Sequence, residues 1–127
     1  MSLNLLATKK APGAIGPYSQ GVKAGNIIYT SAQLPFILET GELLTSDIQE
    51  ETRLCLEYLK AILEEGGASL NDVVKVNVYI TDMNDFGLVN EVYGKFFTDH
   101  KPARCCVEVS KLAKGANIEI DAVAIIL

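Results

Sequence analysis

Only two stretches of this 127-residue chain carry the three-and-four spacing of apolar residues that is typical of a helix. The first begins at Ser46, which has the spacing of a capping box with Gln49, and it ends at a pair of glycines. The second begins at Asn84 or Asp85 and ends before Pro102. The rest of the chain must therefore form strands, turns and loops.

Six other segments have the apolar patterning of strands, and no repeat or linker separates them. They are residues 3–7, 19–24, 27–33, 73–81, 104–109 and 118–126. Gly25 and Asn26 form a turn signal, which predicts a hairpin between the second and third segments. Within the fourth segment, alternation predicts that Val74 shares a buried face with Val76 and the apolar residues that follow at every second position.

Two helices are too few to cover both faces of a six-stranded sheet. We therefore expect an α+β fold, one domain over residues 1–127, in which both helices pack on one face of a mixed sheet. The composition is 49% hydrophobic, which on so small a body indicates apolar surface in a subunit interface. A partner subunit is the expected cover for the second face of the sheet.

The charge balance and the cysteines bear on where the protein works. With 11 basic and 16 acidic residues, the net charge of −5 opposes nonspecific binding to nucleic acid. The 3 cysteines, an odd number with two of them adjacent, indicate reduced thiols in the cytosol. The first residues lack the features of a signal peptide, and the apolar run 122–127 is too short to cross a bilayer. We expect a soluble cytoplasmic protein with neither a membrane nor a nucleic-acid partner.

Several common active sites are absent from the sequence. A single histidine, His100, cannot build a His-rich metal site, and the cysteines lack CxxC spacing. There is no GxSxG or GxGxxG, and the glycine-containing segment 16–23 leads into a strand rather than a helix. The sequence therefore predicts no metal site, no nucleophile-elbow hydrolase and no phosphate-binding loop.

Polar side chains interrupt two strands that should otherwise be packed. Arg104, Cys106 and Glu108 share one face of the fifth segment, and Glu119 interrupts the apolar run of the last. Each has an ordinary structural alternative. The arginine would pair with a surface carboxylate at a sheet edge, and Glu119 would take the solvent side of a half-buried strand. Taken singly, these residues favour the structural role.

Three more polar residues are candidates of the same kind. Asn90 lies next to the apolar face of the second helix, where a surface amide is the alternative. Tyr18 and Ser31 fall in the hairpin region, where an aromatic contact and a strand hydroxyl are the alternatives. None of these signals is specific by itself.

The arrangement as a whole is specific. The segments GAIGPYSQGV, GNIIYTSAQLP, LKAILEEGGASLNDVVKVNVYITDMNDF, VNEVYGKFF and PARCCVEVSKLAKGANIEIDAVA follow one another along the chain. Together they closely resemble the Rid family of reactive-intermediate (enamine/imine) deaminases, also called YjgF-type proteins, over residues 11–124. The most diagnostic part is Pro-Ala-Arg, followed by an apolar strand and then by Ile-Glu-Ile.

The resemblance implies a chorismate-mutase-like α+β fold and a homotrimer, with one site in each cleft between subunits. It implies hydrolysis of 2-aminoacrylate or 2-aminocrotonate, as their imine tautomers, to 2-keto acids and ammonia. These intermediates leak from pyridoxal-phosphate enzymes such as serine and threonine dehydratases, so those enzymes are the expected functional partners. The family's deaminases need neither a cofactor nor a metal, and the resemblance implies the same here.

Carried over residue by residue, the resemblance assigns Arg104 to the substrate carboxylate and Glu119 to the attacking water. A planar guanidinium suits a bidentate pair with a carboxylate. Five further positions match residues that line or adjoin the family's cleft: Tyr18, Ser31, Ala32, Asn90 and, through its backbone, Cys106. Ala32 departs from a frequent Gly and adds a methyl group beside the cleft. The other departures are Cys105, Ala113, Glu51 and Tyr58, where Ser, Pro, Gln and Asn are frequent.

Two other functions stay open. A regulatory module would bind a small 2-keto or amino acid without turnover, and an RNA-cleaving translation inhibitor is also reported within the family. The acidic composition counts against RNA cleavage. A passive sensor of carboxylates needs Arg104 but no base at Glu119, so this pair favours the deaminase. The cysteines are expected to be structural or adjacent to the site, because the route forms no acyl intermediate.

Overall fold

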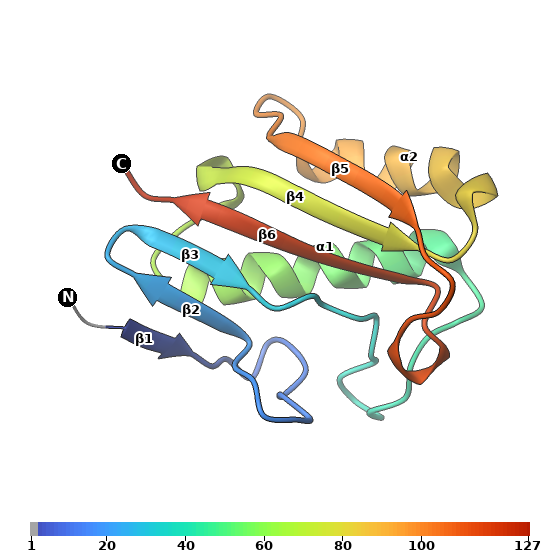
Figure 1. Ribbon diagram of the computed structural model, residues 1–127, viewed down its shortest axis with the longest axis horizontal. Coiled ribbons are helices and arrows are strands. Elements are labelled where there is room, and N and C mark those ends of the chain that lie inside the picture. The colour runs from blue at the N-terminus through green and yellow to red at the C-terminus, as the bar shows by residue number, and fades with distance from the viewer. Residues whose placement is uncertain (1–2) are drawn as a thin grey trace.

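Six strands form one sheet with the order β1-β2-β3-β6-β4-β5 (Figure 1). The structure is a computed structural model that describes residues 3–127. The elements are β1 (Leu3–Leu6), β2 (Gly21–Ala24), β3 (Ile27–Thr30), α1 (Ile48–Glu65), β4 (Val73–Ile80), α2 (Phe86–Phe96), β5 (Ala103–Glu108) and β6 (Ile118–Ile125). β4 and β5 pair in parallel, and each other neighbouring pair is antiparallel. The predicted six-stranded mixed sheet, with a hairpin between β2 and β3, is confirmed.

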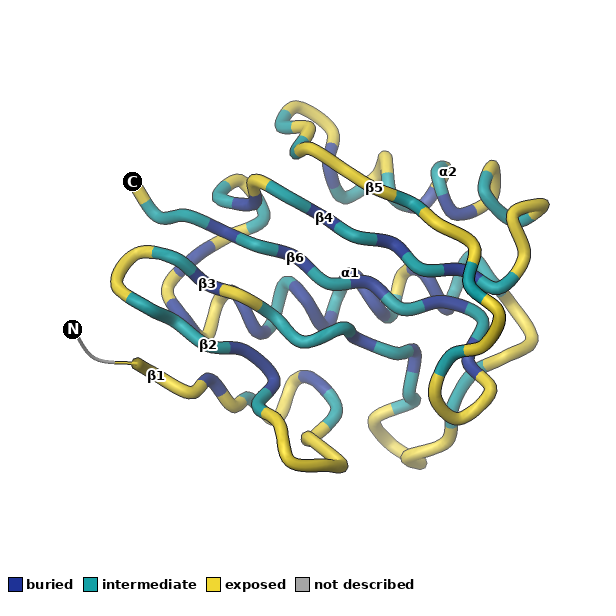
Figure 2. The backbone as a smooth tube through the Cα atoms, in the orientation of Figure 1, coloured by how far each residue is buried: buried dark blue, intermediate teal, exposed yellow. Residues whose placement is uncertain are grey.

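Both helices lie behind the sheet in Figure 1 and cover the same face of it. Along β6, the buried residues Ile118, Ile120, Ala122 and Ala124 alternate with half-buried ones, as expected when one face is packed against helices. α1 packs against β6 and against α2. The predicted placement of both helices on one face is therefore confirmed, and the strand residues of the other face are half-buried or exposed (Figure 2).

The predicted start of α1 is wrong by one residue. Asp47, not Ser46, is the N-cap, and its side chain accepts a hydrogen bond from the Glu50 amide at 3.2 Å. A carboxylate at this position also faces the positive end of the helix dipole, an interaction that a serine hydroxyl does not supply.

The start of α2 also differs in detail from the prediction. Asp85 is at the N-cap position but makes no side-chain capping bond, because its backbone is already helical, with φ −81° and ψ −5°. A 3₁₀ turn, Met83–Asp85, precedes the helix, and Asp82 caps that turn by accepting from the Asn84 amide at 2.9 Å.

Val74 is the clear error in the predicted alternation of β4. It is 42% exposed, whereas Val73 and Val76 are fully buried. The register of β4 against β6 shifts between Val73 and Lys75, which marks a β-bulge. The bulge adds one residue to the strand and turns Val74 away from the core.

The sheet face that carries no helix is partly apolar. Leu3 and Leu5 of β1 are 65% and 69% exposed, Tyr29 of β3 is 53% exposed, and Val107 of β5 is 39% exposed. Exposed apolar side chains on one sheet face are typical of an interface, so the expectation of a partner subunit here stays a prediction. Among residues 3–127, no helix is long and apolar enough to span a membrane.

Glu51, near the start of α1, is a buried carboxylate. It is 0% exposed. One of its oxygens accepts from the Asp47 amide at 2.9 Å and the other from the Asn117 side chain at 3.2 Å. Asn117 also donates to the Thr45 carbonyl at 3.0 Å, so this group ties the loop before β6 to the start of α1. Burial raises the pKa of Glu51, and the charges of Asp47 and Asp85 add to this rise.

We predict that Glu51→Gln changes how stability depends on pH. Because the folded pKa is raised, the native state binds this proton more tightly than the unfolded state does. The contribution of Glu51 to stability is therefore highest at acid pH and is lost as the pH rises through the raised pKa. The free energy of unfolding of the variant, relative to the parent, should accordingly increase from about pH 4 to about pH 7.

Urea unfolding at one protein concentration and several pH values measures this difference. Glu57→Gln, on the outer side of α1, is the matched control, because it removes an equal charge without removing a fully buried one. A constant difference between parent and Glu51→Gln across this pH range would contradict the prediction.

Candidate functional site

Arg104 extends from the start of β5 toward α2 and is held there by three side chains. Its Nη1 donates to Oδ1 of Asn90 at 2.6 Å. The guanidinium lies over the Tyr93 ring at 4.7 Å and over the Phe86 ring at 5.3 Å. All three partners project from α2, at positions three or four residues apart, so a single helix face orients the arginine.

The partners of Arg104 differ from those of an ordinary surface arginine. Within residues 3–127, the ion pair closer than 4 Å is that of Arg53 with Glu50, and Arg104 hydrogen bonds to an amide instead of a carboxylate. A guanidinium has several N–H donors, and the bond to Asn90 uses one of them. Arg104 therefore has a fixed plane and donors available for an anion, which the alternative of a surface ion pair does not explain.

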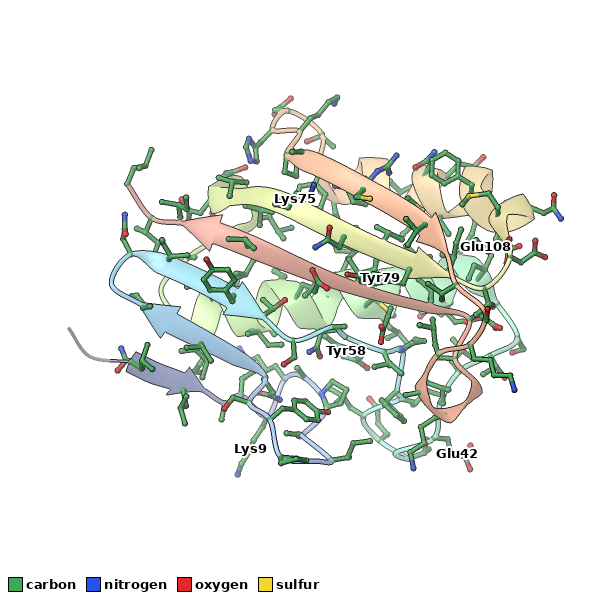
Figure 3. All side chains as sticks on the ribbon, in the orientation of Figure 1. Lys9, Glu42, Tyr58, Lys75, Tyr79 and Glu108 are labelled. Atoms are coloured by element: carbon green, nitrogen blue, oxygen red, sulfur yellow. The ribbon has the colours of Figure 1, made fainter. Side chains whose placement is uncertain are left out.

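Two residues that follow on the same face of β5 have different roles. Glu108 accepts from the Met83 amide at 2.8 Å, which connects the end of β5 to the turn before α2 (Figure 3). Cys106 is half-buried, and burial raises the pKa of its thiol, although Arg104 opposes that rise. A thiol that stays protonated is a poor nucleophile. This supports the prediction that Cys106 is not a catalytic thiol.

Glu119 lies on the half-exposed side of β6, on the face without helices. Its cross-strand neighbour is Tyr79 of β4, and Asp121 follows two residues later on the same face. Burial raises the pKa of Glu119, and the charge of Asp121 raises it further. A carboxyl group with a raised pKa can exchange a proton nearer to neutral pH, which suits a general base.

The register of the sheet places Arg104 and Glu119 on opposite faces. Arg104 pairs with Val76, which pairs with Ala122, and both of these partners are buried on the helix side. Glu119 pairs with Tyr79 on the other side. Paired residues point to the same face of a sheet. Within one chain, the arginine and the glutamate therefore cannot contact the same small molecule.

The remaining candidates divide between the surroundings of Glu119 and those of Arg104. The Ser31 amide donates to the Gln20 carbonyl at 2.8 Å, and its hydroxyl donates to the Ser19 carbonyl at 2.5 Å, which brings the end of β3 beside the loop that carries Tyr18. Gln33 bridges to Ile120, so Ala32 lies next to β6. Ser31 and Ala32 therefore lie beside the part of β6 that carries Glu119, with the loop of Tyr18 next to Ser31, whereas Asn90 and Cys106 lie with Arg104.

Gln20 is a residue that the sequence analysis missed. It is buried, and its Nε2 donates to the carbonyls of Thr8, Ala11 and Pro12 at 3.1, 3.3 and 2.8 Å. Its Oε1 accepts from the Thr8 amide at 2.6 Å. The side chain thus holds the loop before Tyr18 against the start of β2. The available signal was a lone amide directly before the first apolar residues of a strand.

We predict that Gln20→Leu lowers the free energy of unfolding by roughly 2 kcal/mol, because several part-buried backbone groups lose their partners. Gln49→Leu, which removes an exposed amide bonded to the Leu88 carbonyl and to Glu91, should cost less than about 1 kcal/mol. Chemical denaturation of both variants at one concentration measures the difference. Equal losses in the two variants would show that Gln20 does not organise this loop.

Metal ligands do not gather in the part of the chain that the structure describes. Among residues 3–127, no group of 3 or more His, Cys, Asp or Glu side chains could hold a metal ion. The Nε2 of His100 is 2.5 Å from the Val73 carbonyl. All 3 cysteines are free thiols: Cys55 is buried, Cys106 is half-buried and Cys105 is exposed.

A mixed sheet covered by two helices on one face defines an α+β protein, and Arg104 and Glu119 lie on different faces of that sheet. A comparison with protein-family models matches residues 8–126 to the family described as endoribonuclease L-PSP. The chain belongs to this family, which includes the Rid and YjgF-type proteins, and the predicted membership is confirmed.

Individual relatives agree with this assignment over almost the whole chain. A RutC family protein of Pyrococcus abyssi is 54% identical, over 98% of each chain. The 2-iminobutanoate/2-iminopropanoate deaminase of Escherichia coli is 48% identical, over 94% of this chain and 95% of the relative. The crystal structure of Escherichia coli TdcF with bound serine superposes with a TM-score of 0.93 at 46% identity, over 98% of this chain and 99% of the other. The names of these relatives include deaminases of reactive intermediates.

Proposed function

We propose that the protein is an enamine/imine deaminase, which hydrolyses 2-iminopropanoate and 2-iminobutanoate to pyruvate or 2-ketobutyrate and ammonia. The observation that carries this proposal is Arg104, because its guanidinium is held between two aromatic rings and an amide while it keeps donors for a carboxylate. The relative that carries the deaminase name supports the choice of substrate. So does the bound serine of TdcF, which is a small amino acid with a carboxylate.

The proposed mechanism needs orientation and one proton carrier. Arg104 binds the substrate carboxylate, which fixes the imine carbon, an electrophile, next to a water molecule. Glu119 takes a proton from that water as the oxygen attacks the carbon, and it returns this proton to the imine nitrogen, which gives a neutral carbinolamine. Glu119 then takes the hydroxyl proton of the carbinolamine and passes it to the amine, which leaves as ammonia while the carbonyl bond forms. The overall balance is one imine and one water consumed for one keto acid and one ammonia.

The opposite faces of Arg104 and Glu119 require that two chains build one site. We infer a homotrimer in which the face without helices packs against neighbouring subunits, so that Arg104 of one chain meets Glu119 of the next. The exposed Leu3, Leu5 and Tyr29 on that face support this assembly, because an isolated chain would leave them in water. Tyr18, Ser31, Ala32, Asn90 and Cys106 are the other residues proposed to line each cleft.

A ligand-sensing module is the second candidate, and the bound serine of TdcF favours it, since a bound amino acid is compatible with recognition without turnover. It accounts for Arg104 but gives no role to a proton-exchanging Glu119. RNA cleavage, which the name of the family suggests, conflicts with the net charge of −5.

The deciding experiment runs threonine dehydratase with and without this protein while semicarbazide traps the free imine. A deaminase increases the release of 2-ketobutyrate and reduces the trapped product at unchanged dehydratase activity. Unchanged ketobutyrate release would reject the deaminase, and saturable binding of 2-ketobutyrate would then favour the sensing module. The proposal also makes pyridoxal-phosphate dehydratases the functional partners and the cytoplasm the place of action.

A further inference from the structure

Asp121 is a second carboxylate on the same face as Glu119. The two residues are separated by one buried residue, Ile120, on β6, so their Cα atoms lie about 7 Å apart along the strand. Asn77 of β4 is the cross-strand neighbour of Asp121, and its Nδ2 donates to Oδ1 of Asp121 at 2.8 Å. The Asp121 side chain therefore has a fixed position next to Glu119.

This half-buried cluster brings two like charges together in a central strand of the sheet. The cluster residues, Asn77, Tyr79, Glu119 and Asp121, come from β4 and β6, and Figure 3 labels Tyr79 on β4. Asp121 has an amide partner on the neighbouring strand, which holds its carboxylate on the face that carries Glu119. Ordinary solvation of a strand face does not account for this arrangement.

We propose that Asp121, fixed by Asn77, is a positioning residue that keeps the Glu119 carboxylate basic enough to take a proton from water. A negative charge nearby disfavours ionisation of Glu119, so the ionised form that remains is a stronger base. This inference deepens the proposed function and depends on it for the catalytic consequence. The electrostatic coupling of the two carboxyl groups can be measured independently of any activity.

Other titratable or charged side chains also surround Glu119 and Asp121 on β6. On the same face, β4 supplies Lys75 and Tyr79, β3 supplies Tyr29 and β5 supplies Cys105. On the helix side, α1 carries Glu51 and Cys55, and the charges of Glu51 and Glu119 both raise the pKa of Cys55. Lys75 is next to Asn77 on this face and pairs with Val123, so it is farther along the strand from Glu119 than Asp121 is.

The pKa values of Glu119 and Tyr79 are both raised, as expected from this geometry. The pKa of Glu119 is raised by burial first and by the charge of Asp121 second. The pKa of Tyr79 is also raised, by burial first, then by Asp121 and then by Glu119. Tyr79 therefore stays protonated at neutral pH and can donate a hydrogen bond to a carboxylate of the cluster.

The direct test follows the side-chain carboxyl carbon of Glu119 by NMR as the pH changes. In the parent protein, the resonance of Glu119 should titrate above the usual range of a glutamate, because burial and the charge of Asp121 both raise its pKa. In Asp121→Asn, which keeps an oxygen to accept from Asn77, Glu119 should titrate at a pH lower by about half a unit to one unit.

Asp99→Asn is the matched control, because it removes the same charge from the loop that precedes the His100 contact with Val73, at the other end of β4. It should leave the titration of Glu119 unchanged. If Glu119 titrates at the same pH in the parent and in Asp121→Asn, the proposal is wrong. Should Asp121→Asn fail to fold, Asp121→Ser removes the same charge, and an unchanged titration of Glu119 in that variant would overturn the proposal.

The catalytic readout is the acid limb of the pH profile of imine hydrolysis. Asp121→Asn should move that limb to lower pH and reduce the plateau rate about two- to threefold, because the base is weaker. Asp121→Glu keeps the charge and should keep the limb. A limb that does not move in Asp121→Asn rejects the catalytic role of Asp121. If the parent protein hydrolyses no imine at all, the proposed function fails, while the NMR titrations still test the coupling.

Discussion

Glu119→Gln is expected to lower the turnover of 2-iminobutanoate roughly a hundredfold or more, which is the usual contribution of a general base. Glutamine keeps the size and shape of the side chain but cannot take up a proton at neutral pH. The raised pKa of Glu119, caused by burial and by Asp121, is what makes the parent carboxylate an effective base. Binding of an unreactive keto acid such as 2-ketobutyrate should change little, because the carboxylate of that ligand contacts Arg104 instead.

Variants of Arg104 should instead lose keto-acid binding and turnover together. Arg104→Ala should weaken 2-ketobutyrate binding about tenfold or more and reduce turnover with it, since a charge-assisted bidentate contact is lost. Arg104→Lys should remain poor, because an ammonium cannot restore the planar fork or stack in the same way between Tyr93 and Phe86.

Single-turnover hydrolysis beside a keto-acid titration measures both effects. Glu57→Gln, on the outer side of α1, is the control for the loss of a carboxylate and should match the parent in both assays. Normal hydrolysis by Glu119→Gln would remove Glu119 from the mechanism and would favour a module that binds keto acids without turnover.

The elements of this fold were predictable because each is encoded locally. The helical spacing of α1, the turn at Gly25 and Asn26, and the alternation along β6 need no knowledge of the neighbouring strands. The predicted details that failed depend on non-local context. The bulge that turns out Val74 arises from the register of β4 against β6, and the lost capping bond of Asp85 arises from a preceding 3₁₀ turn.

The candidate site was predictable as a set of residues but not as a geometry. Arg104 and Glu119 were identified from their sequence context and from a resemblance, which says nothing of the faces on which they lie. That β6 sits between β3 and β4 follows from pairings between residues more than 40 positions apart, such as Asn77 with Asp121. The contacts of Arg104 with Asn90 and of Gln20 with Thr8 span 14 and 12 positions, and they too depend on the tertiary fold.

The opposite faces of Arg104 and Glu119 lead to the second large effect, which is rescue between two inactive variants. Arg104→Ala and Glu119→Gln should each be nearly inactive alone. In trimers assembled from equal amounts of both, some clefts combine an intact Arg104 from one chain with an intact Glu119 from its neighbour. Random assembly leaves about a quarter of the sites intact, so the mixture should recover roughly a quarter of the parent activity.

The mixture is prepared by unfolding and refolding the two variants together, and light scattering should give a mass about three times the 13.7 kDa of the chain. Arg104→Ala mixed with the double variant Arg104→Ala/Glu119→Gln is the control, because no combination of those chains restores an arginine. If both residues of a site came from one chain, the first mixture would show only the sum of the two residual activities. Recovery in the first mixture and none in the control would therefore place Arg104 and Glu119 of each site on different subunits.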